Sequence, residues 1–328
     1  MTMHTINMRT AVTEGIREAL NKYPECFIAG EDIGILGGAL GATQGLLKEF
    51  GSKRVIDTPI SEAAISGLGV GSAILGMRPI IEIMYLDFIA VCFDELVNQA
   101  AKLRYMFGGQ MKVPVVFRMS GGGSLHTAAH HSQCLEAMLN HAPGIKIVFP
   151  CTPADTKGLL LAAVEDNNPV VFIEHKALYN MKDEVPEGYY TIPLGKARKV
   201  RDGKDVTVVT WGLMTGRCEE AADALTKEGI GVDLLDLRTI KPMDYDAIHA
   251  SVSRTHRLCI VHEACLTNGV GAEIAARAAS DWLYELDAPV VRVASPDASV
   301  PFSAPLEEHA FLPTAEKIAD AVRSQLRG

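Results

Sequence analysis

The sequence has no excess of positive charge and no apolar segment long enough to cross a membrane. Lysine and arginine number 31 against 40 aspartates and glutamates, for a formal net charge of −9. Without a basic stripe, a primary role on nucleic acid is excluded. The uncharged stretch 63–77 is shorter than the ~20 residues of a spanning helix, and the opening residues MTMHTINMRTAVTEGI contain no apolar signal core. We therefore expect a soluble protein that binds neither nucleic acid nor membrane.

Paired cysteine motifs are also absent. The seven cysteines are scattered without a C-x-x-C pair, and Cys92, Cys134 and Cys151 stand among apolar residues. This pattern is typical of reduced thiols in the core of a cytoplasmic protein, and it excludes a disulfide framework or a zinc site.

Several common cofactor and nucleophile motifs are missing as well. Gly67, Gly69 and Gly71 do not complete G-x-G-x-x-G, because Ser72 and Ile74 stand where the pattern would close. These glycines also fall inside a predicted helix instead of at a strand-to-helix turn. Neither GxxxxGK[ST] nor G-x-S-x-G occurs. A nicotinamide dehydrogenase and a serine hydrolase therefore have little support.

The sequence does contain a regular alternation of apolar strands and helices. Strands are predicted at 26–30, 55–57, 80–84, 113–119, 145–149 and 170–174, and helices at 10–21, 43–50, 62–76, 93–107, 132–140 and 154–166. After 177–204, which holds two prolines and mixed charge, strands return at 206–210, 232–237, 258–261 and 290–293, with helices at 216–228, 244–253, 270–286 and 314–326. The pattern predicts two consecutive α/β domains with parallel sheets, at 1–180 and 205–328, joined by a linker at 181–204.

The helix at 62–76 carries a single carboxylate, Glu62, at its first turn. An apolar helix of this kind is expected to be buried all round, with its glycines permitting close backbone packing. One interpretation of Glu62 is a charge that complements the helix dipole, worth about 0.3–1 kcal/mol, with Ser61 as the cap. The other is an acid held at the mouth of a cleft to exchange a proton with a ligand.

Polar and aromatic residues follow several strands of the first predicted domain. Ligands of open parallel sheets bind beyond the carboxyl ends of the strands. Glu31, Glu62, Phe88 and the glycine turn leading to His130–His131 are all expected at that edge. Alone, Phe88 is typical of a core residue, and a histidine before a helix is as often structural as catalytic. Together they have the composition of a site.

An ordered set of motifs resembles one family over nearly the whole chain. GEDIG (30–34), DTPISE (57–62), FDELVNQAAKLRYMFGG (93–109), HHSQ (130–133), DNNPV (166–170), LRTIKPMD (237–244) and VPFSAPLE (300–307) are similar to the beta subunit of the thiamine-diphosphate-dependent first component of 2-oxo acid dehydrogenase complexes. RYMFGG and YNMKDEVPEGYYTIPLGKA (179–197) most resemble the acetoin dehydrogenase type. The resemblance implies a transketolase-like architecture, with a pyrimidine-binding domain followed by a transketolase C-terminal domain.

The resemblance also implies roles for individual residues. Glu62 would hydrogen-bond the aminopyrimidine ring of thiamine diphosphate, Phe88 would pack on that ring, and Ile60 and Met84 would be its apolar neighbours. Glu31 matches a glutamate near the cofactor.

The resemblance assigns His131 to proton transfer and to transfer onto the lipoyl arm, with adjacent His130 as the alternative imidazole. It further implies a potassium site made largely of backbone carbonyls, at Val115, Ala163, Val164, Asp166 and Asn168. Hard oxygen ligands suit such an ion. An uncharged turn before Pro169 explains the same residues equally well.

The family's diphosphate-and-magnesium motif, GDG followed by Asn, is absent, since Asp202–Gly203 follows an arginine. The resemblance then implies that a separate alpha subunit holds the diphosphate and magnesium in an alpha2-beta2 heterotetramer. A lipoyl-bearing acyltransferase would dock on the C-terminal domain. Pyruvate and branched-chain 2-oxo acid dehydrogenases are the alternative enzyme types, and a non-catalytic α/β binding module is the alternative of another class.

Overall fold

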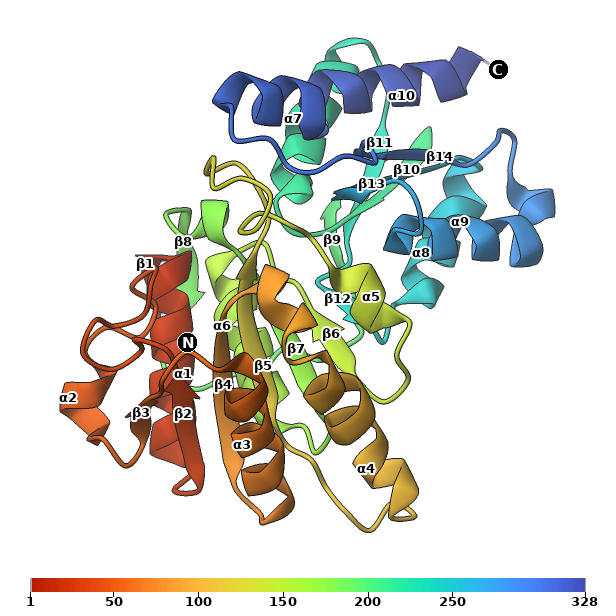
Figure 1. The fold of residues 1–328 in the computed structure, drawn as a ribbon. Coiled ribbons are helices and arrows are strands. Elements are labelled where there is room, and N and C mark those ends of the chain that lie inside the picture. Colours follow the sequence, from red (N-terminus) through yellow and green to blue (C-terminus); the bar gives the residue numbers. More distant parts are fainter. Residues whose placement is uncertain (1, 328) are drawn as a thin grey trace. The chain divides into compact units, whose positions relative to one another are not determined.

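The structure, a computed structural model, describes residues 2–327 and divides into two compact units (Figure 1). The first holds the chain up to Gly121 together with Met138–Leu194, and the second holds Gly122–Ala137 together with the chain from Gly195 onwards. Both alternate strands with helices, which confirms the predicted α/β class.

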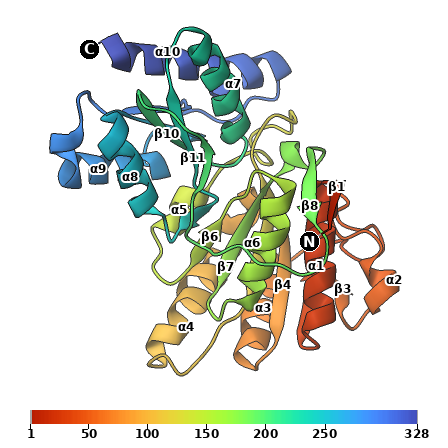
Figure 2. The same ribbon diagram turned by 180° about the vertical axis from the view of Figure 1, so that it is seen from behind.

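The sheet of the first unit runs parallel, in the order β6-β7-β5-β4-β2-β3 within the unit. Helices α3 and α4 cover the face turned to the viewer in Figure 1, and α1 and α6 cover the face seen in Figure 2. Its strands are β2 (Cys26–Gly30), β3 (Val55–Asp57), β4 (Arg78–Tyr85), β5 (Val116–Gly121), β6 (Lys146–Val148) and β7 (Val170–His175). Its helices are α1 (Met8–Lys22), α2 (Leu46–Phe50), α3 (Glu62–Ile74), α4 (Ala101–Met106) and α6 (Pro153–Glu165), while α5 (Glu136–Asn140) crosses from one unit to the other.

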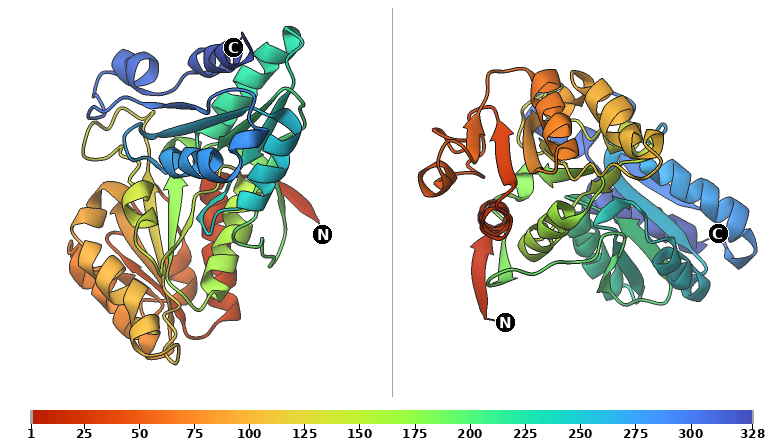
Figure 3. Two further views of the ribbon diagram at one scale, coloured as in Figure 1. Left: turned by 90° about the vertical axis from the view of Figure 1, so that its right-hand side faces the viewer. Right: turned by 90° about the horizontal axis from the view of Figure 1, so that it is seen from below.

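A two-stranded antiparallel ribbon lies beside α1. It pairs β1 (Met3–Asn7) with β8 (Lys182–Pro186), and Figure 3 shows both strands next to α1, which is viewed end-on from below. Sequence analysis missed both strands because their side chains are mostly polar and partly exposed. The same holds for β9 (Arg198–Arg201), which forms an antiparallel edge in the second unit.

The second unit has a sheet in the order β14-β13-β10-β11-β9. Helices α7 and α10 pack on one face through an apolar cluster that includes Val208, Met214 and Val322, while Thr207 points to Ser251 of α8 on the other face. The strands are β10 (Val206–Thr210), β11 (Val232–Asp236), β13 (Leu258–Cys265) and β14 (Val291–Ser295), with a short β12 (Thr239–Lys241) after β11. The helices are α7 (Met214–Lys227), α8 (Tyr245–Thr255), α9 (Val270–Asp281) and α10 (Ala315–Arg327).

Three predicted helices are shorter or less regular than the sequence indicated. The helix predicted at 43–50 begins only at Leu46, because Gly45 has a left-handed φ of 85°. The helix predicted at 93–107 is a π-helical segment, Glu95–Ala100, followed by α4. The helix predicted at 132–140 begins at Glu136, so Ser132 is not its cap.

Helix α3 is not buried all round, which corrects the prediction from its composition. Ile65, Val70 and Ala73 pack inward, whereas Leu68 is 44% exposed and Leu75 is 85% exposed. Of its glycines only Gly69 makes a close approach, since a Cβ there would overlap Ile81. The apolar outer face of α3 is thus left uncovered by its own chain.

Two expectations about the whole chain can be compared with residues 2–327. Over that range, none of the helices combines the length and apolar character needed to span a bilayer. None of the seven cysteines in that range forms a disulfide. Burial raises the pKa of the Cys92 thiol to about 11, so this thiol stays protonated at neutral pH.

A charged cluster lies inside the first unit, across three adjacent strands. Arg118 of β5 is paired in register with Glu82 of β4 and donates to both Glu82 and Glu174 of β7, with its Nη2 3.0 Å from Glu174 Oε2. Tyr179 donates its hydroxyl to Glu174. The three charged residues are at most 8% exposed. Burial raises the pKa of Glu82 in spite of the neighbouring guanidinium.

The substitution Arg118→Met should lower the free energy of unfolding by about 3–5 kcal/mol, because it leaves two buried carboxylates without their cation. The loss should shrink below about pH 5, where protonation removes the uncompensated charge. Urea unfolding at several pH values measures both effects.

Arg17→Met is a matched control, since Arg17 pairs with Glu49 on the surface, where both side chains are more than a third exposed. Its effect should stay within about 1 kcal/mol. Equal losses in the two variants would contradict the proposed importance of the buried cluster.

Candidate active site

The carboxyl edge of the first sheet gathers the ends of β2, β3 and β4. The last residue of β2, Gly30, is in register with Asp57 of β3 and Glu82 of β4. Only glycine fits at this point, because a Cβ on Gly30 would lie 2.8 Å from Glu82 Cβ and 2.9 Å from its carbonyl oxygen. The tight register fixes where the chain leaves β2, and therefore where Glu31 begins the following loop.

Asp57 holds that loop in place. Its carboxylate accepts hydrogen bonds from the backbone N–H of Gly34 at 2.5 Å and of Ile35 at 3.1 Å. The motif DTPISE contains Asp57 but gave no indication of this role. The alternating apolar pattern could not reveal that this carboxylate reaches back 23 residues to the neighbouring loop.

Glu62 is the first residue of α3 and is partly buried. Ser61 makes no capping hydrogen bond, which corrects the expectation that it caps the helix. A carboxylate at this position is favoured by the helix dipole, as the simpler interpretation predicted.

Glu31 and Glu62 are close enough to influence each other electrostatically. Burial raises the pKa of Glu31, and the negative charges of Asp32 and Glu62 raise it further. No cation forms an ion pair with Glu31 or Glu62 within residues 2–327. Burial and the neighbouring negative charges favour the protonated form of Glu31, which is a property suited to acid–base work.

Apolar and aromatic surface lies along the same edge. Phe88 stands in the 3-10 turn η1 (Leu86–Ala90) after β4, partly buried, with its ring edge-to-face with Tyr85 at 5.8 Å. Met84 near the end of β4 is partly buried, and its carbonyl accepts from Ser120 Oγ at 2.5 Å. Ile60 is 72% exposed, so within this chain it contacts little. The structure therefore brings Glu31, Ile60, Glu62, Met84 and Phe88 to one edge of the first unit.

His131 belongs to the segment Gly122–Ala137 of the second unit. It is partly buried, whereas His130 is exposed. Its carbonyl accepts from Thr127 Oγ1 at 3.1 Å, and Thr127 Oγ1 also lies 2.8 Å from Ser132 Oγ. These bonds fix the backbone at His131, and its preference over His130 stays a prediction.

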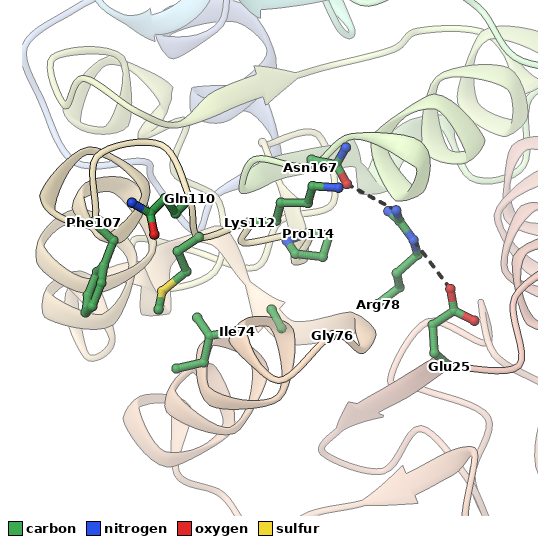
Figure 4. A pocket seen from close by; sticks show the side chains of 11 residues that line it. Glu25, Ile74, Gly76, Arg78, Phe107, Gln110, Lys112, Pro114 and Asn167 are labelled. Atoms are coloured by element: carbon green, nitrogen blue, oxygen red, sulfur yellow. Dashed lines mark hydrogen bonds and ion pairs between the residues drawn. The ribbon is translucent and has the colours of Figure 1, made fainter.

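A cavity of about 540 Å³ lies at the opposite edge of the first sheet (Figure 4). Arg78, the first residue of β4, points into it, with its Nη2 3.1 Å from Asn167 Oδ1 and its Nε 3.7 Å from Glu25 Oε1. Because ligands of open parallel sheets bind at the carboxyl ends, this amino-end cavity is not the candidate active site.

The residues of the predicted potassium site lie near the same amino edge. The carbonyl oxygen of Val164 accepts from Arg78 Nη1 at 2.7 Å, and that of Val115 accepts from the Val170 N–H at 2.9 Å. Asp166 Oδ1 accepts from the Asn168 N–H at 2.8 Å, and Asp166 Oδ2 pairs with Lys146. Each carbonyl oxygen has a second lone pair, so main-chain oxygens remain for a monovalent cation.

Two family descriptions match the chain: "Transketolase, pyrimidine binding domain" over residues 4–182 and "Transketolase, C-terminal domain" over residues 195–318. The acetoin:2,6-dichlorophenolindophenol oxidoreductase subunit beta of Cupriavidus necator is 46% identical over 333 residues, covering 98% of both chains. In Bacillus subtilis, the pyruvate dehydrogenase E1 component subunit beta is 42% identical, covering 99% of both chains. The 2-oxoisovalerate dehydrogenase subunit beta of that organism is 41% identical, covering 98% of both.

Among solved structures, a split-gene transketolase described as an inactive beta4 tetramer has a TM-score of 0.79 at 24% identity, covering 98% of both chains. At that identity the likeness shows a shared fold.

The substitution Glu62→Gln should lower the pKa of Glu31 toward its usual value of about 4.3, because it removes one of the negative charges that raise it. Asp32→Asn should act in the same direction. Carboxyl carbon shifts of labelled glutamate, followed by NMR through a pH titration, measure the change. Glu25→Gln, at the opposite edge of the sheet, should leave this pKa unchanged. An unaltered Glu31 titration in the Glu62 variant would mean that the two carboxylates do not interact.

Proposed function

Because this chain belongs to the family of beta subunits of acetoin and 2-oxo acid dehydrogenases, we propose that it is the beta subunit of a thiamine-diphosphate-dependent acetoin dehydrogenase. Acetoin would be cleaved to acetaldehyde and a two-carbon unit. That unit would leave as an acetyl group on a lipoyl sulfur, its oxidation balanced by reduction of the lipoyl disulfide. The observation that carries the proposal is the uncompensated pair of Glu31 and Glu62 at the carboxyl edge of a pyrimidine-binding domain.

The residues at this edge fit the pyrimidine half of the cofactor. Thiamine diphosphate, when bound, supplies the electron sink that carbon–carbon cleavage next to a carbonyl requires. Glu62 would hold a proton in a hydrogen bond to a ring nitrogen, and Glu31 would help to keep that proton in the site. Phe88 offers an aromatic surface for stacking, which adds about 0.5–1.5 kcal/mol beyond area burial. Ile60 and Met84 would exclude water from the ring.

The remaining candidate residues have two separate roles, one in transfer to the acceptor and one at the amino edge of the first sheet. His131 would move a proton during transfer to the lipoyl sulfur. Val115, Ala163, Val164, Asp166 and Asn168 would hold a potassium ion as a structural ligand set. The reduced state of the seven cysteines agrees with a cytoplasmic location.

The uncovered face of α3 supports an alpha-subunit partner. Leu68, Ile74 and Leu75 project from it, each 39% exposed or more, and Gly67 leaves open space. An apolar helix face of this kind marks a protein interface. We propose that the alpha subunit binds in an alpha2-beta2 heterotetramer and supplies the diphosphate and magnesium ligands. The lipoyl-bearing acyltransferase would bind the complex through the C-terminal domain of this chain.

The choice of acetoin as substrate is supported by identity and by two motifs. The acetoin-type relative is 46% identical, against 44% and 42% for two pyruvate-type relatives and 41% for the 2-oxoisovalerate type. RYMFGG and the stretch 179–197 resemble the acetoin type. A pyruvate dehydrogenase beta subunit is the second candidate, because the difference in identity is small.

Glu62→Gln in the complex with the alpha subunit should lower turnover by on the order of 10²-fold or more, since proton transfer by a positioned group contributes that much. The complex should still assemble by size-exclusion chromatography, because Glu62 is not in the core. Glu25→Gln is the matched control and should turn over normally. Wild-type turnover in the Glu62 variant would refute the assigned role.

Wild-type complex should oxidise acetoin at least about 10-fold faster, as kcat/KM, than pyruvate or 2-oxoisovalerate, a preference of about 1.4 kcal/mol in transition-state binding. A dye such as 2,6-dichlorophenolindophenol serves as acceptor in one assay, and a lipoyl domain in the other. Preference for pyruvate would replace the acetoin assignment with the second candidate. Calorimetry with thiamine diphosphate tests the non-catalytic alternative, which predicts no binding heat for the complex.

A further inference from the structure

The loop 122–131, which leads into His131, has an unfavourable backbone. Ser124, His126 and Ala128 have φ values of 66°, 56° and 61°, in the left-handed region that side chains disfavour. Such a backbone persists only where its surroundings hold it. The contacts that hold this loop therefore decide where its last residue lies.

Glu307 makes more of those contacts than any other residue, while Ser124 Oγ also bonds Glu308 and Arg217. It stands in the π-helical segment η5 (Leu306–Phe311) and its side chain is 0% exposed. Its Oε1 accepts from the Ser124 N–H at 3.1 Å. Its Oε2 accepts from the His126 N–H at 3.0 Å and lies 2.6 Å from His126 Nδ1. One buried carboxylate thus binds two backbone amides and one imidazole of the strained loop.

A second carboxylate also accepts a hydrogen bond from the loop. Glu263, near the end of β13, accepts the Gly123 N–H at 2.6 Å. A Cβ on Gly123 would lie 2.9 Å from Glu307 Oε1, so only glycine lets the two acids approach the backbone together. The loop is held at three amides, those of residues 123, 124 and 126, by groups distant in sequence.

The charge of Glu307 has no lysine or arginine to compensate it among residues 2–327, because Arg217 pairs with neighbouring Glu308 instead. Loop N–H groups and the His126 ring are its only partners there. A side chain that serves only to stabilise the unit would not need a buried charge on a strained loop, since apolar packing is less costly.

We infer that Glu307, assisted by Glu263, is a positioning residue that fixes the loop 122–131 and through it the imidazole of His131. The inference rests on the proposed function, in which His131 serves transfer to the lipoyl group. Thr127 and Ser132 hold the far end of the loop, so the carboxylates set its first half and these hydroxyls set its second.

The test compares Glu307→Gln, His131→Ala and the double variant in the complex with the alpha subunit. Glutamine keeps the size but not the charge that binds three donors. Glu307→Gln should lower kcat with a lipoyl domain by on the order of 10²-fold, the usual cost of a misplaced catalytic group. Turnover with the dye acceptor and the dissociation constant for thiamine diphosphate should change less than about 3-fold. The double variant should be no slower than His131→Ala alone, because both changes remove the same imidazole.

The exposed Glu316→Gln of α10 is the control and should leave both rates unchanged. If Glu307→Gln fails to assemble, Glu263→Gln and His126→Ala, which each remove one contact, should show the same split between acceptors in weaker form. Equal losses with dye and lipoyl acceptors, or multiplied losses in the double variant, would overturn the inference. A wild-type complex with no turnover on any substrate would instead count against the proposed function.

Hydrogen exchange gives a direct readout of the loop. The amides of Gly123, Ser124 and His126 should exchange slowly in the wild type and at least about 10-fold faster in Glu307→Gln, because they lose their acceptor. Unchanged exchange at these amides would also overturn the inference.

Discussion

Parallel pairing in the first unit places the ends of neighbouring strands at one edge, and the rest of the candidate site depends on that arrangement. Gly30 stands level with Asp57 and Glu82, which leaves no room for a side chain where β2 ends. The loop that begins with Glu31 must therefore turn outward at once, and Asp57 holds it there. Helix α3 follows the adjacent strand β3. Its first residue, Glu62, is therefore near enough to Glu31 for its charge to raise the pKa of Glu31. Backbone register, not side-chain affinity, brings the two acids together.

Three groups of acids in this chain differ in the partners of their carboxylates. Glu82 and Glu174 share the Arg118 guanidinium, an arrangement that serves the core. Glu263 and Glu307 are neutralised by backbone N–H groups, an arrangement that fixes a loop. Glu31 and Glu62 have no cation among the described residues and repel each other. Of these acids, Glu31 and Glu62 are the ones that a hydrogen-bonding ligand would stabilise most, which supports their proposed role in the site.

Hydrophobic periodicity predicted the strands with apolar runs, whether fully buried like β2 and β10 or at the sheet edge like β3. Strands β2, β3 and β10 begin and end where the apolar runs indicated, because each is bounded by a turn or a charge. Polar edge strands such as β1 and β9 were missed, since their stability comes from pairing and not from burial. Glu31 and Glu62 were predicted from motifs in a fixed order and Phe88 from the family resemblance, and their roles stay predictions.

No local pattern could reveal the carboxylate of Glu307, whose partner Ser124 lies 183 residues away. The exposed side of α3 could not be predicted from amino-acid composition either. Apolar residues indicate a tendency to burial without showing which surface covers them, and Leu75, just after α3, is 85% exposed.

Two features of the isolated chain are energetically unfavourable, and binding of a partner or a ligand would relieve both. Leu68 of α3 and Leu75 just after it remain exposed, and the pKa of Glu31 is raised by burial and by the charges of Asp32 and Glu62, with no cation paired to it among the described residues. A partner that covers the helix would also lower the local dielectric around Glu62, since Glu62 is the first residue of that helix. A lower dielectric strengthens a hydrogen bond from the carboxyl to a ring nitrogen. It also increases the repulsion between the unpaired carboxylates of Glu31 and Glu62. Assembly and cofactor binding should therefore favour each other in the proposed complex.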